Sequence, residues 1–90
     1  MSYAYVREYT SFAADIDLSG VPPADVNAGA VARLEVVDAG SGGLALRLSG
    51  GTANVALTAL TVGDVPLHPD KILASGTTVA KVRVWWNRRS

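Results

Sequence analysis

Few residues of this chain could carry out chemistry, and His68 comes first because it is the only histidine. Asp70 follows two positions later and could orient the imidazole, as a carboxylate does in a catalytic dyad. Such a dyad activates a nucleophile, but the chain has no cysteine and no serine in a nucleophile-elbow sequence. We interpret His68 as a surface residue, predict no catalytic residue and expect that the protein is not an enzyme.

A second candidate is the acidic stretch at residues 15–20, which has the sequence Asp-Ile-Asp-Leu-Ser-Gly and matches the opening of a calcium-binding loop. The twelfth position of that loop requires a bidentate glutamate, and Val26 stands there. Two prolines, Pro22 and Pro23, also interrupt the stretch. We therefore predict two acids on the solvent face of a strand, closed by a Ser-Gly turn, with no metal site and no cofactor.

The glycine run at residues 40–43, Gly-Ser-Gly-Gly, lacks the lysine and the following helix of a phosphate-binding loop, so it predicts a flexible turn. The C-terminal region combines two tryptophans with bases: Lys81, Arg83, Trp85, Trp86, Arg88 and Arg89. Such a mixture binds single-stranded nucleic acid in some proteins, anchors protein interfaces in others, and also suits a buried strand with a solvated basic end. Eight Lys and Arg balance eight Asp and Glu, so we predict no nucleic-acid partner.

A small scaffold must position these side chains, because the chain has 90 residues and forms one domain. Hydrophobic residues make up 49% of it, but so short a domain buries a modest share of its surface, and without cysteine no disulfide can stabilise it. No apolar run reaches the ~18 residues of a membrane span, so we expect no membrane partner. The start of the chain lacks the basic and apolar regions of a signal peptide, and none is expected. Self-association is one way to bury more surface.

Aromatic residues and charges are unevenly distributed along the chain. The aromatics lie in the first twelve and the last six residues: Tyr3, Tyr5, Tyr9, Phe12, Trp85 and Trp86. Residues 1–45 hold six acids and two bases, whereas residues 46–90 hold two acids and six bases. This asymmetry predicts either cross-strand ion pairs within the fold or a dipolar surface that meets a second copy.

Alternation of apolar and polar residues predicts strands over 31–37, 44–48, 53–59, 71–74 and 79–86, with weaker patterns over 12–18 and 3–9. Gly50-Gly51 predicts a hairpin between the second and third of these strands, and residues 38–43 predict a hairpin loop before the second. Pro66 and Pro69 disfavour central strand pairing around Leu67. The one short helix candidate, at residues 23–26, predicts no more than a turn.

This spacing predicts an all-β fold: a small antiparallel sandwich or jelly-roll-like barrel of six to eight short strands. We expect residues 1–11 to form an N-terminal arm or edge strand, residues 12–87 a single β domain and residues 88–90 a basic tail. In the last strand, Ala80, Val82, Val84 and Trp86 should point to one face, and Val79, Lys81, Arg83 and Trp85 to the other. The predicted core is Leu34, Val36, Leu44, Leu46, Leu48, Val55, Leu57, Ile72, Val82 and Val84.

Several segments, taken in order, resemble a known family. Residues 63–67 are Gly-Asp-Val-Pro-Leu, and residues 71–78 are Lys-Ile-Leu-Ala-Ser-Gly-Thr-Thr, followed by an alternating strand that ends on an aromatic residue. Upstream, residues 32–36 are Ala-Arg-Leu-Glu-Val. This arrangement, over residues 12–86, resembles small β-structured virion proteins of tailed phages, prophages and gene transfer agents, of the head spike-base type. The chain departs from the family's acidic turn at residues 17–22 and has an extra proline, Pro69.

The resemblance implies a structural virion protein. It would be an oligomeric base or adaptor on the surface of a phage-like particle, where it holds a spike or fibre, with capsid or fibre proteins as partners. It would be made in the cytoplasm of the bacterial host and located on the virion surface. The residues alone leave an alternative open, a small carbohydrate-binding β module with Trp85 or the N-terminal tyrosines as its stacking platform.

Assembly is the last expectation from the sequence. We expect a homo-oligomer, a ring or a trimer, that uses the aromatic-bearing ends of the chain, because tyrosine and tryptophan anchor interfaces at little entropic cost. In the competing interpretation, the N- and C-terminal strands pair and their aromatics meet inside one subunit. The interface candidates are Tyr3, Tyr5, Tyr9, Phe12, Arg83, Trp85, Trp86 and Arg88.

Overall fold

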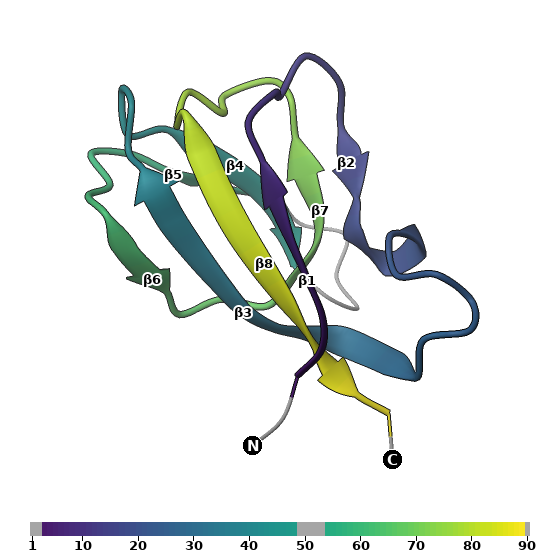
Figure 1. Ribbon diagram of the computed structural model, residues 1–90. Coiled ribbons are helices and arrows are strands. Elements are labelled where there is room, and N and C mark those ends of the chain that lie inside the picture. The colour runs from purple at the N-terminus through teal and green to yellow at the C-terminus, as the bar shows by residue number, and fades with distance from the viewer. Residues whose placement is uncertain (1–2, 49–53, 90) are drawn as a thin grey trace.

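The computed structural model describes residues 3–48 and 54–89, in which strands are the main secondary structure (Figure 1). The strands are β1 (Tyr3–Tyr9), β2 (Ile16–Asp17), β3 (Ala28–Asp38), β4 (Leu44–Leu48), β5 (Asn54–Leu57), β6 (Gly63–Val65), β7 (Pro69–Leu73) and β8 (Lys81–Arg88). A single 3₁₀ turn, η1 (Leu18–Gly20), is the helical element of the described residues. The predicted all-β fold of six to eight short strands is confirmed.

The strands form two four-stranded antiparallel sheets packed face to face, as in a sandwich (Figure 1). One sheet has the order β1-β8-β3-β6 and the other β2-β7-β4-β5. Among the described strands, only β4 and β5 follow each other in sequence and also pair, with Leu46 opposite Val55. This confirms the predicted pairing of these two strands, although the Gly50-Gly51 turn between them lies outside the described residues.

The second predicted hairpin is wrong, because β3 and β4 belong to different sheets. Residues 39–43 carry the chain across the sandwich instead. Gly40 and Gly42 adopt φ angles of 51° and 82°, which favour glycine, and the Gly42 amide donates to the Ala39 carbonyl at 2.7 Å. The glycine run was therefore correctly interpreted as a turn. However, this turn leads the chain from one sheet to the other and does not form a hairpin within one sheet.

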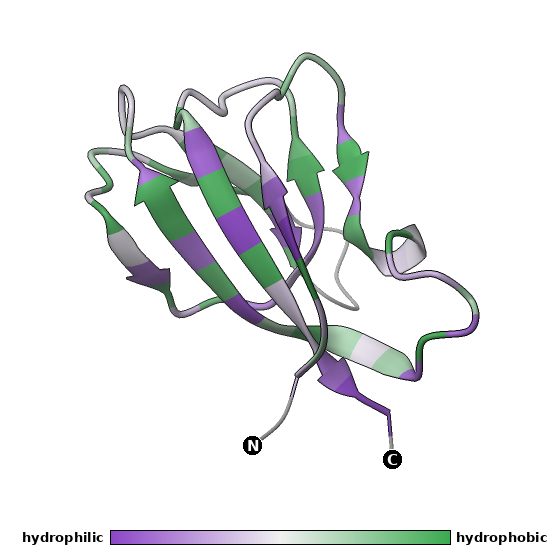
Figure 2. Cartoon of the chain, viewed as in Figure 1, coloured by the Kyte–Doolittle hydropathy of each residue, from purple (hydrophilic) through white to green (hydrophobic). Residues whose placement is uncertain are grey.

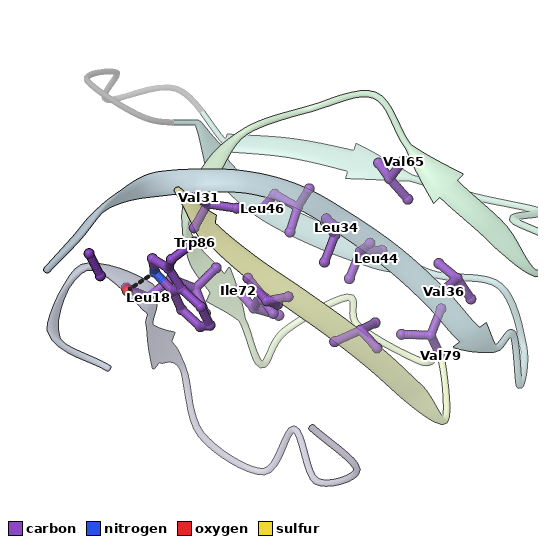
Figure 3. Packing of buried hydrophobic residues seen from close by; sticks show 13 residues of the cluster. Leu18, Val31, Leu34, Val36, Leu44, Leu46, Val65, Ile72, Val79 and Trp86 are labelled. Carbon is purple, nitrogen blue, oxygen red and sulfur yellow. Dashed lines mark hydrogen bonds between the residues drawn. The ribbon is translucent and has the colours of Figure 1, made fainter. Parts of the chain in front are cut away.

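The core fills the space between the two sheets with branched aliphatic side chains and one tryptophan (Figure 3). Of the ten predicted core residues, seven are buried: Leu34, Val36, Leu44, Leu46, Ile72, Val82 and Val84. The other three are half-buried, because Val55 and Leu57 lie on an edge strand and Leu48 ends β4. Trp86 is 1% exposed, and its indole N–H donates to the Leu18 carbonyl at 3.0 Å.

The first part of β8 alternates in hydropathy as predicted (Figure 2). Val82, Val84 and Trp86 of this strand are buried. The predicted facing fails just before β8, where Ala80 is exposed. Val79 is buried, because it precedes β8 in the crossing segment and donates its amide to the Gly43 carbonyl. In β3, a bulge lets two residues oppose one, so that Val31 rather than Ala32 takes the buried position opposite Trp86. The predicted strand over 12–18 shrinks to β2.

A cluster of hydrogen bonds joins the crossing loop after β3 to the loop before β8. The Thr78 hydroxyl accepts from the Gly43 amide at 2.9 Å, and the Thr77 hydroxyl accepts from the Ala45 amide at 3.1 Å. A Cβ at position 43 would lie 2.5 Å from the Thr78 hydroxyl oxygen and 2.8 Å from the Gly76 carbonyl oxygen, so Gly43 permits this approach. The Gly-Thr-Thr sequence that contributed to the family resemblance therefore has a structural role in holding the start of β4.

We predict that Thr78→Val, which keeps the shape but removes the hydroxyl, lowers the free energy of unfolding by about 1 kcal/mol, because the Gly43 amide loses its acceptor. Thr78→Ser keeps the hydroxyl and should retain most of the stability. Urea denaturation followed by circular dichroism measures both. Equal stability of the two variants would show that the hydrogen bond contributes nothing.

Candidate interaction surface

The N-terminal segment is an edge strand that pairs with the C-terminal strand along most of its length (Figure 1). In the register of β1 with β8, Tyr3 is opposite Asn87 and Tyr5 is opposite Trp86, which leaves Ala4 as one extra residue. This bulge sends the two tyrosines to opposite faces of the sheet. Tyr3 lies against Trp85, with ring centroids 6.1 Å apart, and Tyr5 lies against Trp86 at 5.6 Å.

The terminal aromatics therefore meet within one subunit, as the competing interpretation predicted. Trp86 is buried in the core, so naming it as an interface candidate was wrong: a second chain cannot reach it in this fold. Tyr5, Tyr9 and Phe12 are half-buried and pack against the same core. Burial also raises the pKa of the Tyr9 phenol. Of the six aromatics, Tyr3 and Trp85 lie on the face turned away from the second sheet.

We call this face of the β1-β8-β3-β6 sheet the outer face, and it carries Tyr3, Val6, Glu8, Arg33, Glu35, Asp64, Arg83 and Trp85. Its centre is Trp85. The Arg33 guanidinium lies 4.2 Å from the centroid of the Trp85 ring, and Arg33 Nε donates to Asp64 Oδ1 at 2.9 Å. Arg33 thus covers the indole in a cation–π contact, which stabilises an exposed site modestly. Its ion pair with Asp64 also links β3 to the edge strand β6.

The Arg83 guanidinium forms the other centre of charge on the outer face. Its Nε donates to Glu8 Oε2 at 2.8 Å, its Nη2 donates to the same oxygen, and its Nη1 lies 3.8 Å from Glu35 Oε1. Arg83 therefore links β1, β8 and β3. These pairs join acids from the first half of the chain to a base from the second, as the charge asymmetry predicts, whereas the pair of Arg33 and Asp64 joins the two halves in the opposite sense.

These contacts shift the titration of the exposed groups. The hydrogen bond from Arg83 holds the pKa of the Glu8 carboxyl below its ordinary value. The Asp64 carboxylate likewise raises the pKa of Arg33. The Glu8 carboxylate therefore stays charged at neutral pH and is not poised to transfer a proton.

Apolar side chains remain exposed at both edges of this sheet. Among the described residues, three large hydrophobic side chains are exposed by more than a third: Tyr3 (37%), Val6 (50%) and Val62 (64%). Tyr3 and Val6 belong to β1 and border an open hollow of about 470 Å³ beside Trp85. Val62 precedes β6 at the opposite edge. Val6 and Val62 were not predicted from the sequence, because their exposure depends on the bulge and on the sheet order, for which the chain has no local signal.

The residues considered for chemistry have structural partners. His68 Nδ1 lies 3.1 Å from the Val31 carbonyl oxygen, and no hydrogen bond within the described residues joins His68 to Asp70. Asp15 accepts from the Ala74 amide at 2.7 Å. Asp17 accepts from the backbone and the hydroxyl of Ser19, which lowers the pKa of its carboxyl. The two acids of the supposed calcium loop thus point to different backbone groups rather than to a common centre.

The predicted basic tail begins inside the fold, because Arg88 ends β8. Arg88 is exposed there, and Ala28 of β3 lies opposite it. The Arg89 amide donates to the Asn27 carbonyl at 2.9 Å, and the Asn27 side chain donates back to the Arg89 carbonyl at 2.7 Å. Of the predicted tail, residues 88 and 89 therefore belong to the β domain.

The part of the chain that the structure describes contains no group of three or more metal-binding side chains, and none of its helical segments is long and apolar enough to cross a membrane. No known protein family, curated protein or solved structure matches the chain. The outer face and the two edges of its sheet are thus the candidate interaction surface of the described residues.

We predict that Arg83→Gln raises the pKa of Glu8 toward its ordinary value of 4.5, because the guanidinium is the main cause of the lowered pKa. With the folded-state pKa below that of the unfolded chain, the pair stabilises the fold above pH 4.5 and loses this effect as the pH falls through the lowered pKa. Carboxyl NMR titration measures the shift.

Lys81→Gln is the matched control for this titration. It removes the same charge two residues away on β8, where the lysine makes a smaller contribution to the pKa of Glu8. An equal shift of the Glu8 pKa in both variants would contradict a specific role for Arg83. The lowered pKa would then be due to the combined positive charge of the nearby bases.

Proposed function

We propose that the protein is a structural subunit that assembles with copies of itself and serves as a base or adaptor on the surface of a phage-like particle. The observation that carries the proposal is the exposure of Tyr3, Val6 and Val62 at the two edges of one sheet. Apolar side chains left exposed at unpaired strands favour pairing with another chain. A domain of 90 residues also gains stability from surface buried between subunits.

The chemistry of the outer face agrees with a structural role. Arg33 and Arg83 are both engaged with carboxylates of neighbouring strands. Charged groups that satisfy one another hold the sheet together and have little capacity left to bind or activate a small substrate. A rigid sandwich with apolar edges is suited to stacking side by side on a larger surface.

The assignment to a particle rests on the resemblance described above. The segments at 63–67 and 71–78 are similar to those of spike-base proteins of phages and gene transfer agents. Capsid or fibre proteins are the proposed partners, and the virion surface is the proposed location. Mass spectrometry of phage-like particles purified from the bacterium that encodes the chain tests this part: presence at many copies per particle supports it, and absence contradicts it.

A carbohydrate-binding module is the second candidate, because Tyr3 and Trp85 lie beside a shallow hollow on the outer face. A sugar stacks on an uncovered aromatic face. Here the guanidinium of Arg33 already lies over the Trp85 ring, 4.2 Å from its centroid, and the guanidinium of Arg83 lies 5.7 Å from the same centroid. A glycan would have to displace a paired arginine, so the geometry favours the structural subunit.

We predict that light scattering at high micromolar concentration and low salt gives a mass that is a multiple of the 9.3 kDa chain. Val6→Lys should lower this mass, because a charge on an exposed edge position opposes pairing while costing the fold less than about half a kcal/mol. Ser75→Lys, at an exposed position in the loop after β7 of the other sheet, is the matched control and should leave the mass unchanged. A native chain that stays monomeric would overturn the proposal.

We also predict that a panel of soluble oligosaccharides leaves the tryptophan fluorescence and the Trp85 indole NMR signal unchanged. The reason is that Arg33 covers the ring and is held in place by Asp64. Arg33→Ala uncovers the ring and provides the comparison. Saturable shifts in the native chain would favour the carbohydrate-binding module instead.

A further inference from the structure

The β2-β7-β4-β5 sheet also has a face turned away from the core, which we call the second face (Figure 1). In the register of β4 with β7, Arg47 is opposite Lys71, so both side chains leave the same face with their Cβ atoms about 5 Å apart. Asp17 of β2 is opposite Lys71 on its other side, and Asn54 of β5 is opposite Arg47. We call Lys71 and Arg47, the two bases at the centre of this row, the basic pair.

The basic pair lies on the second face because the next residues along the strands fill the core. Leu46 and Ile72, which adjoin Arg47 and Lys71 in sequence, are both 0% exposed. Successive residues of a strand point to opposite sides of the sheet, so the two bases point away from the core. Both are half-buried, which leaves part of each side chain accessible to a partner.

The basic pair has no carboxylate partner within the described residues, where every ion pair lies on the outer face of the other sheet. Asp17, the acid at the end of the row, accepts hydrogen bonds from the amide and the hydroxyl of Ser19. Asp70 directly precedes Lys71, yet it forms no ion pair with either base. Two neighbouring cations therefore remain without a neutralising acid.

Like charges directly opposite each other destabilise a sheet. On the outer face, Arg83 stands between Glu8 and Glu35, so that each neighbour of this base is an acid. The second face lacks this compensation at the basic pair. Because local conflicts of this kind are expected at functional sites, the pair indicates a surface that binds an anion.

The Arg47 guanidinium also has an N–H donor without an acceptor. Its Nε is buried and forms no hydrogen bond within the described residues. A carboxylate that binds a guanidinium in the bidentate manner accepts from two N–H groups at once. After a rotation of the outer bonds of the side chain, such a ligand would give Nε the acceptor that these residues do not provide.

We propose that the basic pair binds an acidic segment of a partner protein, in which neighbouring Asp or Glu carboxylates contact Arg47 and Lys71. This inference rests on the proposed adaptor role and names a surface by which the subunit meets a protein other than its own copies. The neighbouring residues on the edge strand β5, Asn54 and Ala56, are exposed and small. A partner segment can therefore approach from this side without displacing a bulky side chain.

The arrangement suits an acidic protein segment better than a nucleic acid. A nucleic-acid strand carries a phosphate at every nucleotide and binds along an extended series of bases and aromatic side chains. The row across this sheet has two bases and ends at Asp17, which would repel a continuing polyanion. Two carboxylates match the basic pair in number, and the planar guanidinium is well suited to one of them.

Titration with a short oligoglutamate peptide at low salt tests the inference, followed by NMR of the Arg47 Nε–H and the backbone amides of β4 and β7. We expect saturable shifts that weaken as the salt concentration rises. Arg47→Gln and Lys71→Gln should each lower the affinity about 5-fold, as expected for one exposed charge contact. Arg7→Gln, which removes the same charge from an exposed position of β1 in the other sheet, is the matched control and should keep the native affinity.

Urea denaturation gives a second readout, which a merely structural role for Lys71 would not produce. Lys71→Gln should raise the urea midpoint while it weakens peptide binding, because it removes the like charge opposite Arg47. A lower midpoint with unchanged peptide binding would assign Lys71 a structural role and overturn the inference. Tighter binding of a single-stranded oligonucleotide of equal charge would overturn it in favour of nucleic acid.

The outcomes also separate this inference from the proposed function. An oligomeric native chain that shows no saturable shifts with oligoglutamate would overturn the anion-binding surface and leave the self-assembly intact. A monomeric native chain that binds the peptide through Arg47 and Lys71 would support this surface and overturn the self-assembly.

Discussion

Trp86 is the side chain on which the sandwich depends. The rest of the core consists of leucine, valine, isoleucine and alanine, which fill a narrow space between two short sheets. The indole closes one end of that space, contacts Tyr5 of the edge strand and donates its N–H to the Leu18 carbonyl (Figure 3). A buried indole N–H without an acceptor would cost free energy, so the 3₁₀ turn must present that carbonyl. Asp17 holds the turn in place by accepting from the Ser19 amide.

The period-two pattern explains why much of the fold was predictable from the sequence. Leu34 and Val36, or Val82 and Val84, alternate with polar neighbours, and burial follows directly from that alternation. Three features were not predictable. The bulges at Ala4 and Ala32 have no local signature, and the order of strands in each sheet depends on contacts between segments distant in sequence. The glycines at 40–43 favour a turn but do not specify which strand comes next in space.

The same limits apply to the interaction surface. The aromatics lie near the two ends of the sequence, and two of them, Tyr3 and Trp85, contact each other on the outer face. Adjacent residues on a strand face opposite sides, so one of Trp85 and Trp86 had to be internal, and the alternation placed Trp86 on the same face as Val82 and Val84. The exposure of Val6 was evident only in the structure, where half of its surface remains accessible after β1 pairs with β8.

The bulge at Ala4 has a consequence for how the protein can change over generations. By adding one residue, it separates the tyrosine that completes the interior from the tyrosine that faces outward. Substitutions at Tyr3 can then alter the chemistry of the outer face without disturbing the packing around Trp86. The outward-facing residues of β1 can therefore be substituted while the buried residues stay the same. One short strand thus contributes both to the stability of the core and to a surface that is free to change.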